Sequence, residues 1–406
     1  MNIKKHWLGS SFAKLWTSSA ISMIGDGALL AAGPLLVASQ TSEPALVAAA
    51  VLAQRLPWIL FSLISGVYAD RLDRRQVIII ANIVRAAAIG SLTLAIGLDS
   101  ASLMVIYAAL FMLGVGDTLA ENAEIALLPS VVPKKRLELA NSWLQGADVL
   151  GRQLLGPPLG AYLFVVLAVL PFGLDVVTFV VAALIIATIK VEKHPKTVLA
   201  PRRSMIYEAR EGIFWLSQRR QLKAVALSIG VMNITFMAAF ASFVLYVQQQ
   251  LGLGPVEYGI LLSVSAVGGV IGMRLAPMLA ERFSAAALLR AGLLIEAIID
   301  ISFAANHSPW LAGIIYAVFG MHSVVWGVIT TSLRQRATPD HLLGRVNSVY
   351  SLFSKGGLAV GALLGGVIAH VYGIAAPFWF AGVVMMLWAG IIWKHLADDV
   401  WPKKRI

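Results

Sequence analysis

Twelve long apolar stretches, separated by short polar loops, dominate this sequence. Each is roughly 20 residues or longer, the length that crosses about 30 Å of hydrocarbon as a helix. Lipid offers no hydrogen-bond partner to a free backbone group, so we expect every stretch to be helical. The predicted spans are residues 14–38, 45–68, 77–98, 102–127, 140–167, 171–189, 223–248, 258–280, 287–305, 310–332, 347–371 and 375–393.

Composition agrees with an all-α integral membrane protein. Hydrophobic residues make up 59% of the chain and charged residues 13%, whereas soluble proteins carry about 25% charged residues. The basic start resembles a secretory signal, but the apolar segment that follows continues to Ala38 and contains Asp26, which favours a retained first span. The chain has no cysteine, which excludes disulfides and thiolate metal sites.

The basic residues give the chain a predicted orientation. In a soluble protein the net charge of +11 would suggest nucleic-acid binding, but here Lys and Arg lie between apolar stretches. By our count, 27 of the 32 lie in alternate loops, at the span ends that border these loops or in the two tails, and the six opposite loops hold none. Because cytoplasmic loops are enriched in Lys and Arg, this pattern predicts twelve spans with both termini in the cytoplasm.

The chain divides into two related halves. We expect an N-terminal six-helix bundle over 1–189, a cytoplasmic linker over 190–222 and a C-terminal bundle over 223–406. Residues 205–216 have apolar residues at helical spacing, so this part is either a surface helix or a plain linker. Two intervals recur between the halves, set by Pro133, Asn141 and Gly160 in the first and by Pro339, Asn347 and Gly366 in the second. Duplicated halves are typical of secondary transporters, with the substrate at their interface.

The loop after the second span carries a recognisable motif. It reads Gly66-Val-Tyr-Ala-Asp70-Arg71-Leu-Asp73-Arg74-Arg75. This resembles the Gly-x-x-x-Asp-Arg-x-Gly-Arg-Lys/Arg signature of the major facilitator superfamily, with Asp73 in place of the second glycine. The stretches 128–160 and 333–348 are similar to the drug and siderophore exporter branch, which includes macrolide-efflux and enterobactin exporters.

The motif also has a physical interpretation. Gly66 permits close helix approach, and Asp70 can meet the positive end of another helix. If this pairing forms in one conformation only, the loop acts as a gate. The alternative is that Arg71, Arg74 and Arg75 only fix the topology.

A second motif lies in the fifth span. Gly156-Pro157-x-x-Gly160 is similar to the antiporter motif of exporter branches, although Arg152 stands where a further glycine is usual. Small residues allow tight helix packing and proline bends a helix. The motif therefore favours export only mildly.

Charged residues inside the first-half spans are candidate coupling sites, because an unpaired charge in mid-bilayer costs at least about 2.5–3.5 kcal/mol. The resemblance implies that spans 1, 4, 7 and 10 line the cavity. Asp26 in span 1 is then either a proton or substrate site or a structural partner of Arg55. Asp117 and Glu121 share a face of span 4, an arrangement suited to proton uptake and release.

Other intramembrane charges have more structural interpretations. Asp148 and Arg152, four residues apart, predict an internal ion pair, and Asp175 predicts an interfacial cap. Glu296 and Asp300 share a face of span 9 and are expected to turn inward in a structural role, the deeper of the two toward Arg274. Lys355 either attracts an anionic substrate or pairs with a carboxylate of the other half. The other candidates either line the cavity or simply pack, and they are His322, Trp326, Phe236, Phe240 and Phe243.

Together these features predict a proton-coupled exporter of amphipathic small molecules, acting as a monomer in a bacterial inner membrane. An uptake symporter or a lysolipid flippase is the alternative within the transporter class. No nucleotide-binding, metalloprotease or nucleophile-elbow motif is present in the sequence, so we expect no ATP, metal or other cofactor and no enzymatic activity. A sensor would need an output domain, and the tails are too short to hold one.

Overall fold

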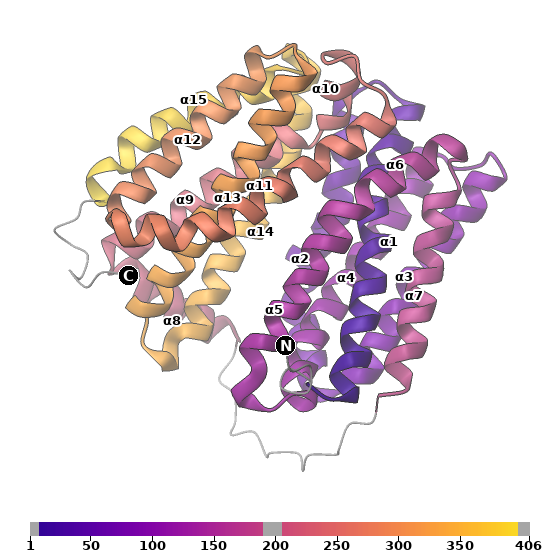
Figure 1. The fold of residues 1–406 in the computed structure, drawn as a ribbon, viewed down its shortest axis with the longest axis horizontal. Helices are drawn as coiled ribbons and strands as arrows, with labels where there is room; N and C mark the ends of the chain where they lie inside the picture. The colour runs from indigo at the N-terminus through magenta and orange to yellow at the C-terminus, as the bar shows by residue number, and fades with distance from the viewer. Residues whose placement is uncertain (1–7, 190–204, 397–406) are drawn as a thin grey trace. The chain divides into compact units, whose positions relative to one another are not determined.

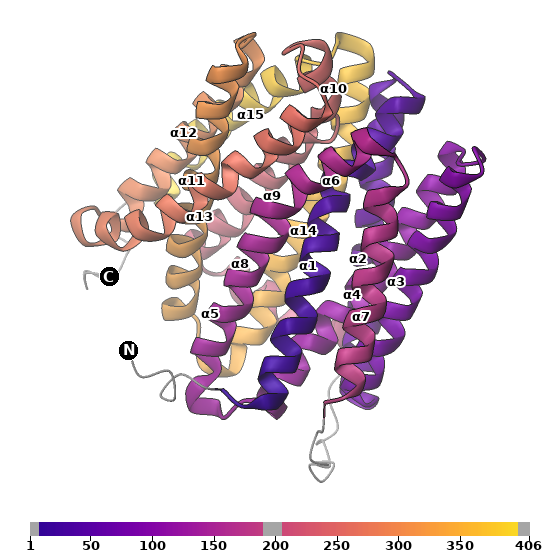
Figure 2. The same ribbon diagram turned by 45° about the vertical axis from the view of Figure 1, so that its right-hand side comes forward.

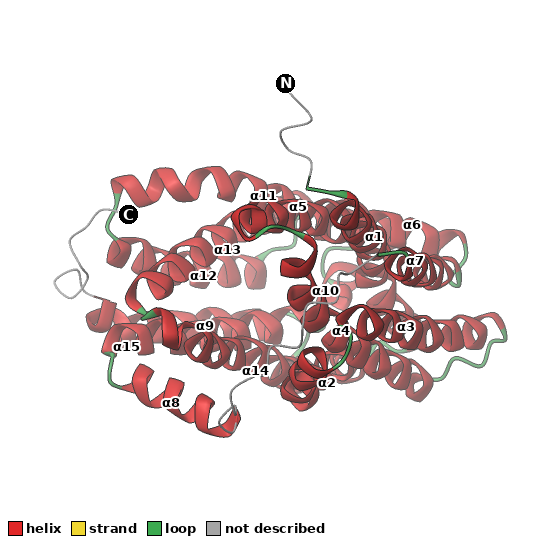
Figure 3. Cartoon of the chain, turned by 90° about the horizontal axis from the view of Figure 1, so that it is seen from below, coloured by secondary structure: helices red, strands yellow, loops and turns green. Residues whose placement is uncertain are grey.

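The computed structural model describes residues 8–189 and 205–396, and their side chains apart from those of 62–71, 134, 205–209 and 340–341. These residues form helices joined by short loops, without strands in the described part (Figure 3). The prediction of an all-helical membrane fold is confirmed.

Nine helical segments precede residue 190. Their bounds are α1 (Ser10–Gln40), α2 (Pro44–Arg71), α3 (Arg74–Gly97), α4 (Leu103–Val131), η2 (Lys134–Arg136), α5 (Leu137–Ala147), η3 (Asp148–Leu155), α6 (Gly156–Val166) and α7 (Leu170–Ala187). Helix α1 packs against α6 and α7, and α3 packs against α4 and α7 (Figures 1 and 2).

Nine more follow residue 204. They are α8 (Met205–Ser217), α9 (Arg220–Phe240), α10 (Phe243–Gln249), α11 (Pro255–Arg282), α12 (Ala285–Ala305), α13 (Pro309–Ala337), α14 (Asp340–Tyr372), α15 (Ala376–Ile392) and η4 (Trp393–Leu396). Helix α14 packs against α9, and α12 packs against α13 and α15.

The chain forms two compact units. The first unit comprises Met1–Thr41, Ala53–Leu199 and Pro255–Ser263, and the second comprises Ser42–Leu52, Ala200–Gly254 and Val264–Ile406. The predicted boundaries at 189 and 223 stay a prediction, because residues 190–204 lie outside the described part.

Eleven helices in the described residues are long and apolar enough to cross a membrane. The expected ninth span, α12, is not among them. It carries Arg290, Glu296 and Asp300 within 21 residues, more charge than a typical span contains. The twelve-span count therefore stays a prediction that depends on what neutralises these three groups.

Close helix packing explains the antiporter-like motif. A Cβ atom added to Gly156 would lie 2.5 Å from the Cα atom of Gly27, and one added to Gly160 would overlap the backbone of Ala28. In the second unit, a Cβ on Gly365 would lie 2.6 Å from the Cα atom of Ala238. Glycine thus brings α6 against α1 and α14 against α9, as small residues do in membrane helix pairs.

The predicted fifth span is not a uniform helix. Its middle, η3, is π-helical, with the N–H of Gly156 bonded to the carbonyl of Gly151. Pro157 and Pro158 have no N–H to donate to the preceding turn. The carbonyl of Leu154, which Pro158 leaves without its usual donor, instead accepts a 2.7 Å hydrogen bond from the Ser263 hydroxyl. Such π segments are frequent at functional sites.

The loops that precede α3 and α12 each end in a residue that caps the helix. The Asp73 carboxylate caps α3 by accepting from the N–H of Arg75 at 3.0 Å. Ser284, three residues after Glu281 as Asp73 is after Asp70, caps α12 by accepting from the N–H of Ala287 at 3.2 Å. The acid that replaces the usual glycine in the loop motif therefore satisfies a helix N-terminus.

Candidate functional site

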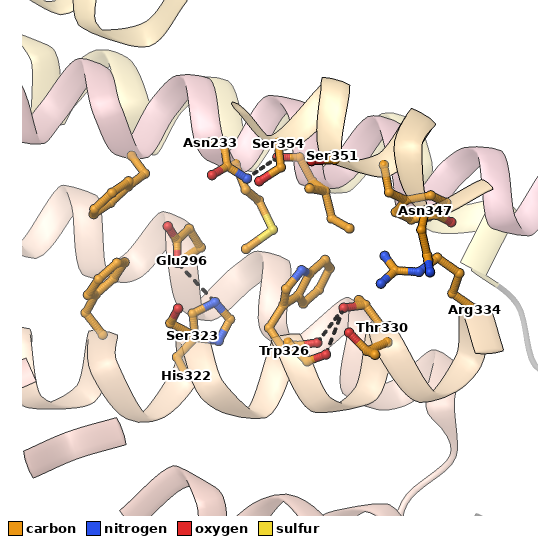
Figure 4. Close-up of a pocket in the computed structure, with 17 residues that line it drawn as sticks. Asn233, Glu296, His322, Ser323, Trp326, Thr330, Arg334, Asn347, Ser351 and Ser354 are labelled. Atoms are coloured by element: carbon orange, nitrogen blue, oxygen red, sulfur yellow. Dashed lines mark hydrogen bonds and ion pairs between the residues drawn. The ribbon is translucent and has the colours of Figure 1, made fainter. Parts of the chain in front are cut away.

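A cavity of about 510 Å³ opens within the second unit (Figure 4). Its walls come from α9, α12, α13 and α14. The aromatic lining is Phe236, Phe319, Trp326 and Tyr350, and the uncharged polar lining is Asn233, Ser323, Thr330, Thr331, Asn347, Ser351 and Ser354. Three ionisable side chains, Glu296, His322 and Arg334, complete it. Its size and mixed lining fit an amphipathic small molecule.

Glu296 and His322 form a buried acid–imidazole pair on this cavity (Figure 4). Glu296 Oε2 and His322 Nε2 are 3.0 Å apart, with side chains only 3% and 4% exposed. The distance is that of an ion pair, but neither atom makes a hydrogen bond of acceptable geometry. Such a pair carries no net charge when its two groups share one proton. It can therefore exist as two neutral groups or as two opposite charges.

The expected contact of the deeper acid of α12 with Arg274 is wrong. Arg274 is exposed on α11, and no ion pair joins it to either acid among the described side chains. Glu296 instead meets His322 from the next helix. Asp300 is 2% exposed, and its Oδ2 atom has no hydrogen-bond partner.

Arg334 lies at the opposite end of the labelled lining from Glu296 and His322, with Trp326 between (Figure 4). Its guanidinium lies over the Tyr350 ring, 4.6 Å from the centroid, and its Nε atom has no hydrogen-bond partner. In the count of loop residues from the sequence, Arg334 is one of the basic residues that predict the orientation of the chain. The structure places it in the cavity wall as well.

The aromatic candidates divide between cavity and core. Phe236 stacks on Phe319 at 5.1 Å, and both line the cavity, as does Trp326. Phe240 and Phe243 do not line it. They pack into a cluster of rings with Tyr246, Phe303, Tyr316 and Phe378.

Asp26 of the first unit is paired with Arg152. Their closest atoms, Asp26 Oδ2 and Arg152 Nη2, are 2.9 Å apart, and Arg152 Nε also lies 3.4 Å from Asp148 Oδ1. The predicted Asp148–Arg152 pair is therefore present. The predicted Asp26–Arg55 pair is wrong, since Arg55 is exposed and the η3 segment brings Arg152 to α1 instead.

Asp117 is also held by an arginine. Arg85 of α3 contacts Asp117 through both Nε, at 2.7 Å, and Nη2, and it bonds Asn82 at 3.2 Å. The Phe179 ring lies 4.7 Å from the guanidinium carbon. Sequence reasoning missed Arg85, although it is one of five basic residues that lie well inside the predicted spans. In the family's arrangement span 3 lies outside the cavity-lining helices, and an arginine buried there needs an acid as its partner.

The remaining acids and bases are dispersed. Glu121 is exposed and accepts a 3.2 Å hydrogen bond from the indole of Trp58. Lys355 is half-buried on α14 and does not line the cavity. Asp175 is fully buried and accepts a bond from the Thr178 hydroxyl at 3.2 Å. The expected interfacial cap is therefore wrong, since α7 begins at Leu170.

Half of the gating loop can be placed. The side chains of Gly66, Asp70 and Arg71 lie outside the described residues. Arg74 donates to the carbonyl of Ala126 at 2.8 Å, and Arg75 donates to the carbonyl of Ile189 at 2.8 Å. These bonds tie the start of α3 to the ends of α4 and α7 within the first unit.

The helical fold is that of the major facilitator transporters. A bacterial homologue of the iron transporter ferroportin, in its inward-facing state, superposes with a TM-score of 0.70 at 20% identity, covering 93% of this chain and 98% of that one. A bacterial homologue of the human lysosomal transporter Spinster, inward-facing and occupied, gives 0.75 at 14% identity, covering 97% and 98%. These likenesses show a shared fold.

The particular family follows from sequence. The family described as "Transmembrane secretion effector" matches residues 8–400, and the chain belongs to it. Macrolide efflux protein A of Streptococcus pyogenes is 24% identical over 92% of this chain and 93% of its own length. Enterobactin exporter EntS of Salmonella typhimurium is 26% identical over 90% of this chain and 87% of its own. The predicted resemblance to the exporter branch and the choice of transporter over enzyme are confirmed.

Proposed function

We propose that this chain is a proton-coupled exporter that moves amphipathic small molecules across a bacterial inner membrane by alternating access, as a monomer. The observation that carries the proposal is the 510 Å³ cavity, which combines aromatic walls, hydroxyl and amide groups and a buried protonatable pair. The similarity to a macrolide efflux protein and an enterobactin exporter supports the outward direction.

The cavity supplies both kinds of contact that an amphipathic substrate needs. The rings of Phe236, Phe319 and Trp326 offer apolar faces. Asn233 and Ser351, with the other polar lining residues, offer hydrogen bonds that orient the molecule. Such a lining binds by burying apolar area and selects by placing a few polar groups.

We assign proton coupling to Glu296 and His322. Exchange is simplest when substrate and proton compete for one site, and both groups line the substrate cavity. A substrate that bonds either side chain disturbs their shared proton, which can then leave on the side to which the cavity is open. The 3.0 Å pair without a settled hydrogen bond is suited to such rearrangement.

Asp26, Asp117 and Glu121 form a second set of coupling candidates. Asp26 and Asp117 are held by Arg152 and Arg85, so each gains or loses a proton only when its arginine moves. Such pairs suit a structural role or a conformational switch. Glu121 contacts Trp58 at an exposed position.

The loop motif is proposed as a gate. Arg74 and Arg75 anchor α3 to neighbouring carbonyls, while Gly66, Asp70 and Arg71 are assigned the conformation-dependent contact. Asp70→Asn is then expected to lower transport while insertion stays intact.

The energetics are sufficient for export. One proton returning down about 150 mV releases about 3.4 kcal/mol, which supports a gradient of about 300-fold for a neutral solute. No second energy source is needed.

Transport by inside-out vesicles with an imposed pH gradient tests the proposal. Fluorescent amphipathic probes should accumulate when the vesicle interior is acidic, and a protonophore should abolish the accumulation. Probe accumulation that ignores the pH gradient would contradict proton coupling, and absence of any probe movement would contradict export. Single cysteines at exposed Ser42, Ser100 and Lys135 test the orientation, since only the first two should label from outside.

A further inference from the structure

Arg334 is a partly buried cation without a carboxylate partner among the described side chains that line the cavity. Its side chain is partly exposed, and its Nε atom has no hydrogen-bond partner. Its guanidinium makes a cation–π contact with the Tyr350 ring. Among the described side chains, no carboxylate lies within ion-pair distance of it. An aromatic face offsets only part of the cost of burying a cation.

Other arginines of the described chain show what a structural role looks like. Arg85 contacts Asp117, Arg152 contacts Asp26, and Arg345 contacts Glu211 at 2.8 Å. Each guanidinium in these pairs has a carboxylate of the chain itself. Arg334 has the same fork of donors and is aimed into a cavity instead (Figure 4).

The charge balance of the cavity is therefore positive. Its single acid, Glu296, lies against His322, so the pair contributes no net charge when it holds one proton. Arg334 then gives the lining a net charge of one positive unit. A cationic ligand would meet this charge without a free carboxylate to offset it, whereas an anion would satisfy the unpartnered guanidinium.

Resting on the proposed function, we propose that the substrates are amphipathic organic anions whose acidic group binds Arg334. The aromatic body then lies along Trp326 toward Phe236 and Phe319, and the hydroxyls of Thr330 and Ser351 bond its polar edge. Arginine suits this role because its planar fork matches carboxylate, sulfonate and phosphate oxygens. Neutral and cationic molecules of the same shape bind more weakly.

Two dyes that differ by one anionic group provide the test. 8-Anilinonaphthalene-1-sulfonate and N-phenyl-1-naphthylamine share an aromatic body, and only the first carries a sulfonate. Binding to the purified full chain is followed by quenching of tryptophan fluorescence, with Trp326→Phe identifying the cavity signal. The wild-type protein should bind the sulfonate at least about tenfold more tightly, the effect of one charge-assisted hydrogen bond. Equal or reversed affinities for the two dyes would overturn the proposal without any variant.

Variants then locate the anion site. Arg334→Gln should weaken sulfonate binding about tenfold or more and change naphthylamine binding less than about twofold, and Arg334→Lys should retain part of the preference. Arg336→Gln is the matched control, because Arg336 is exposed and outside the cavity. Loss of both dyes together in Arg334→Gln with an unchanged melting temperature would contradict the assignment, as would an equal effect of Arg336→Gln.

Competition distinguishes where the anion comes from. Displacement of the sulfonate dye by a soluble aromatic carboxylate supports a substrate from water, and displacement by lysophosphatidylglycerol alone supports one from the lipid. Displacement by neither overturns the anion site. Vesicle transport of the neutral dye is measured in parallel. If the anion site fails its tests while the neutral dye is still exported, the proposed function stands and only this inference is wrong. If the neutral dye is not exported by the wild-type protein, the proposed function itself is wrong.

Discussion

The two units share a helical plan but differ in how some of their intramembrane charges are paired. In the first unit, arginines hold two acids of the membrane-spanning helices, as Arg85 holds Asp117 and Arg152 holds Asp26. In the second, Glu296 has only an imidazole beside it, and Arg334 has an aromatic ring. A pair of permanent opposite charges is a stable arrangement, whereas an acid beside a histidine can change its charge by moving one proton. Duplication of a fold therefore need not duplicate its chemistry, and we assign the changing part to the second unit.

Neutralising Glu296 is expected to have the largest effect on transport. Glu296→Gln should abolish proton-driven accumulation, a loss of up to about 300-fold, because the shared proton site is gone. Its melting temperature should change little, since glutamine leaves no buried charge. Substrate accumulation and thermal unfolding are measured together, with the exposed Glu257→Gln as control. Full accumulation in Glu296→Gln would move the coupling site to Asp26, Asp117 or Glu121 and remove the contrast between the units.

Breaking a first-unit pair should instead reduce stability. Arg85→Gln leaves Asp117 without its cation and should cost about 3–5 kcal/mol, the effect of removing one partner of a buried pair. The double variant Arg85→Gln/Asp117→Asn should recover most of that loss, because neither charge then remains. Unfolding monitored in detergent gives both values. A double variant as unstable as the single one would show that Arg85 acts by packing on Phe179 and not through its charge.

The glycine contacts should behave alike in both units. Gly160→Ala and Gly365→Ala each place a Cβ atom against a neighbouring helix backbone and should cost about 1–3 kcal/mol by overpacking. Gly146→Ala is the control, since nothing lies within 4 Å of its added Cβ, and it should be neutral or stabilising by at most about 1 kcal/mol. Thermal unfolding of the three variants compares them directly. A loss of stability in only one of the two variants would show that the glycine contacts are not equivalent in the two units.

The helix caps should give the smallest effects. Asp73→Ala and Ser284→Ala each remove an acceptor at a helix N-terminus and should cost about 0.5–2 kcal/mol. Asp73→Gly, which introduces the usual residue of the loop motif, should cost only a few tenths of a kcal/mol relative to the wild type, less than Asp73→Ala. The same unfolding assay resolves these differences. If Asp73→Ala lowers transport without lowering stability, Asp73 belongs to the gate and not only to the cap.

Much of the fold was predictable because it depends on periodic and additive signals. Apolar length located the helices, and the alternation of basic loops gave their expected orientation. Irregular features were harder to predict. The π-helical turn depends on Pro157, Pro158 and the distant Ser263 acting together, and a sequence window around the motif does not contain Ser263.

The site was less predictable because charge pairing is a property of neighbours in space. Asp26 was singled out correctly as a buried acid, but its partner comes from η3 and not from α2. Glu296 and His322 were both named, yet their positions 26 residues apart gave no sign of the 3.0 Å contact. Arg334 was counted with the loop residues because it lies near the end of its helix. Its exposure to the cavity depends on the tilt and rotation of α13, which composition does not encode.

Arg152, which stands where the antiporter motif usually has a glycine, also restricts how this sequence can evolve. Its guanidinium serves two acids from two helical segments, Asp26 and Asp148. Arg152→Gly alone would leave both carboxylates without this cation. Neutralising Asp26 alone would remove the ion pair that joins Arg152 to α1. Positions 26 and 152 are therefore expected to change together in descent, so that homologues with glycine at the second position carry a neutral residue at the first.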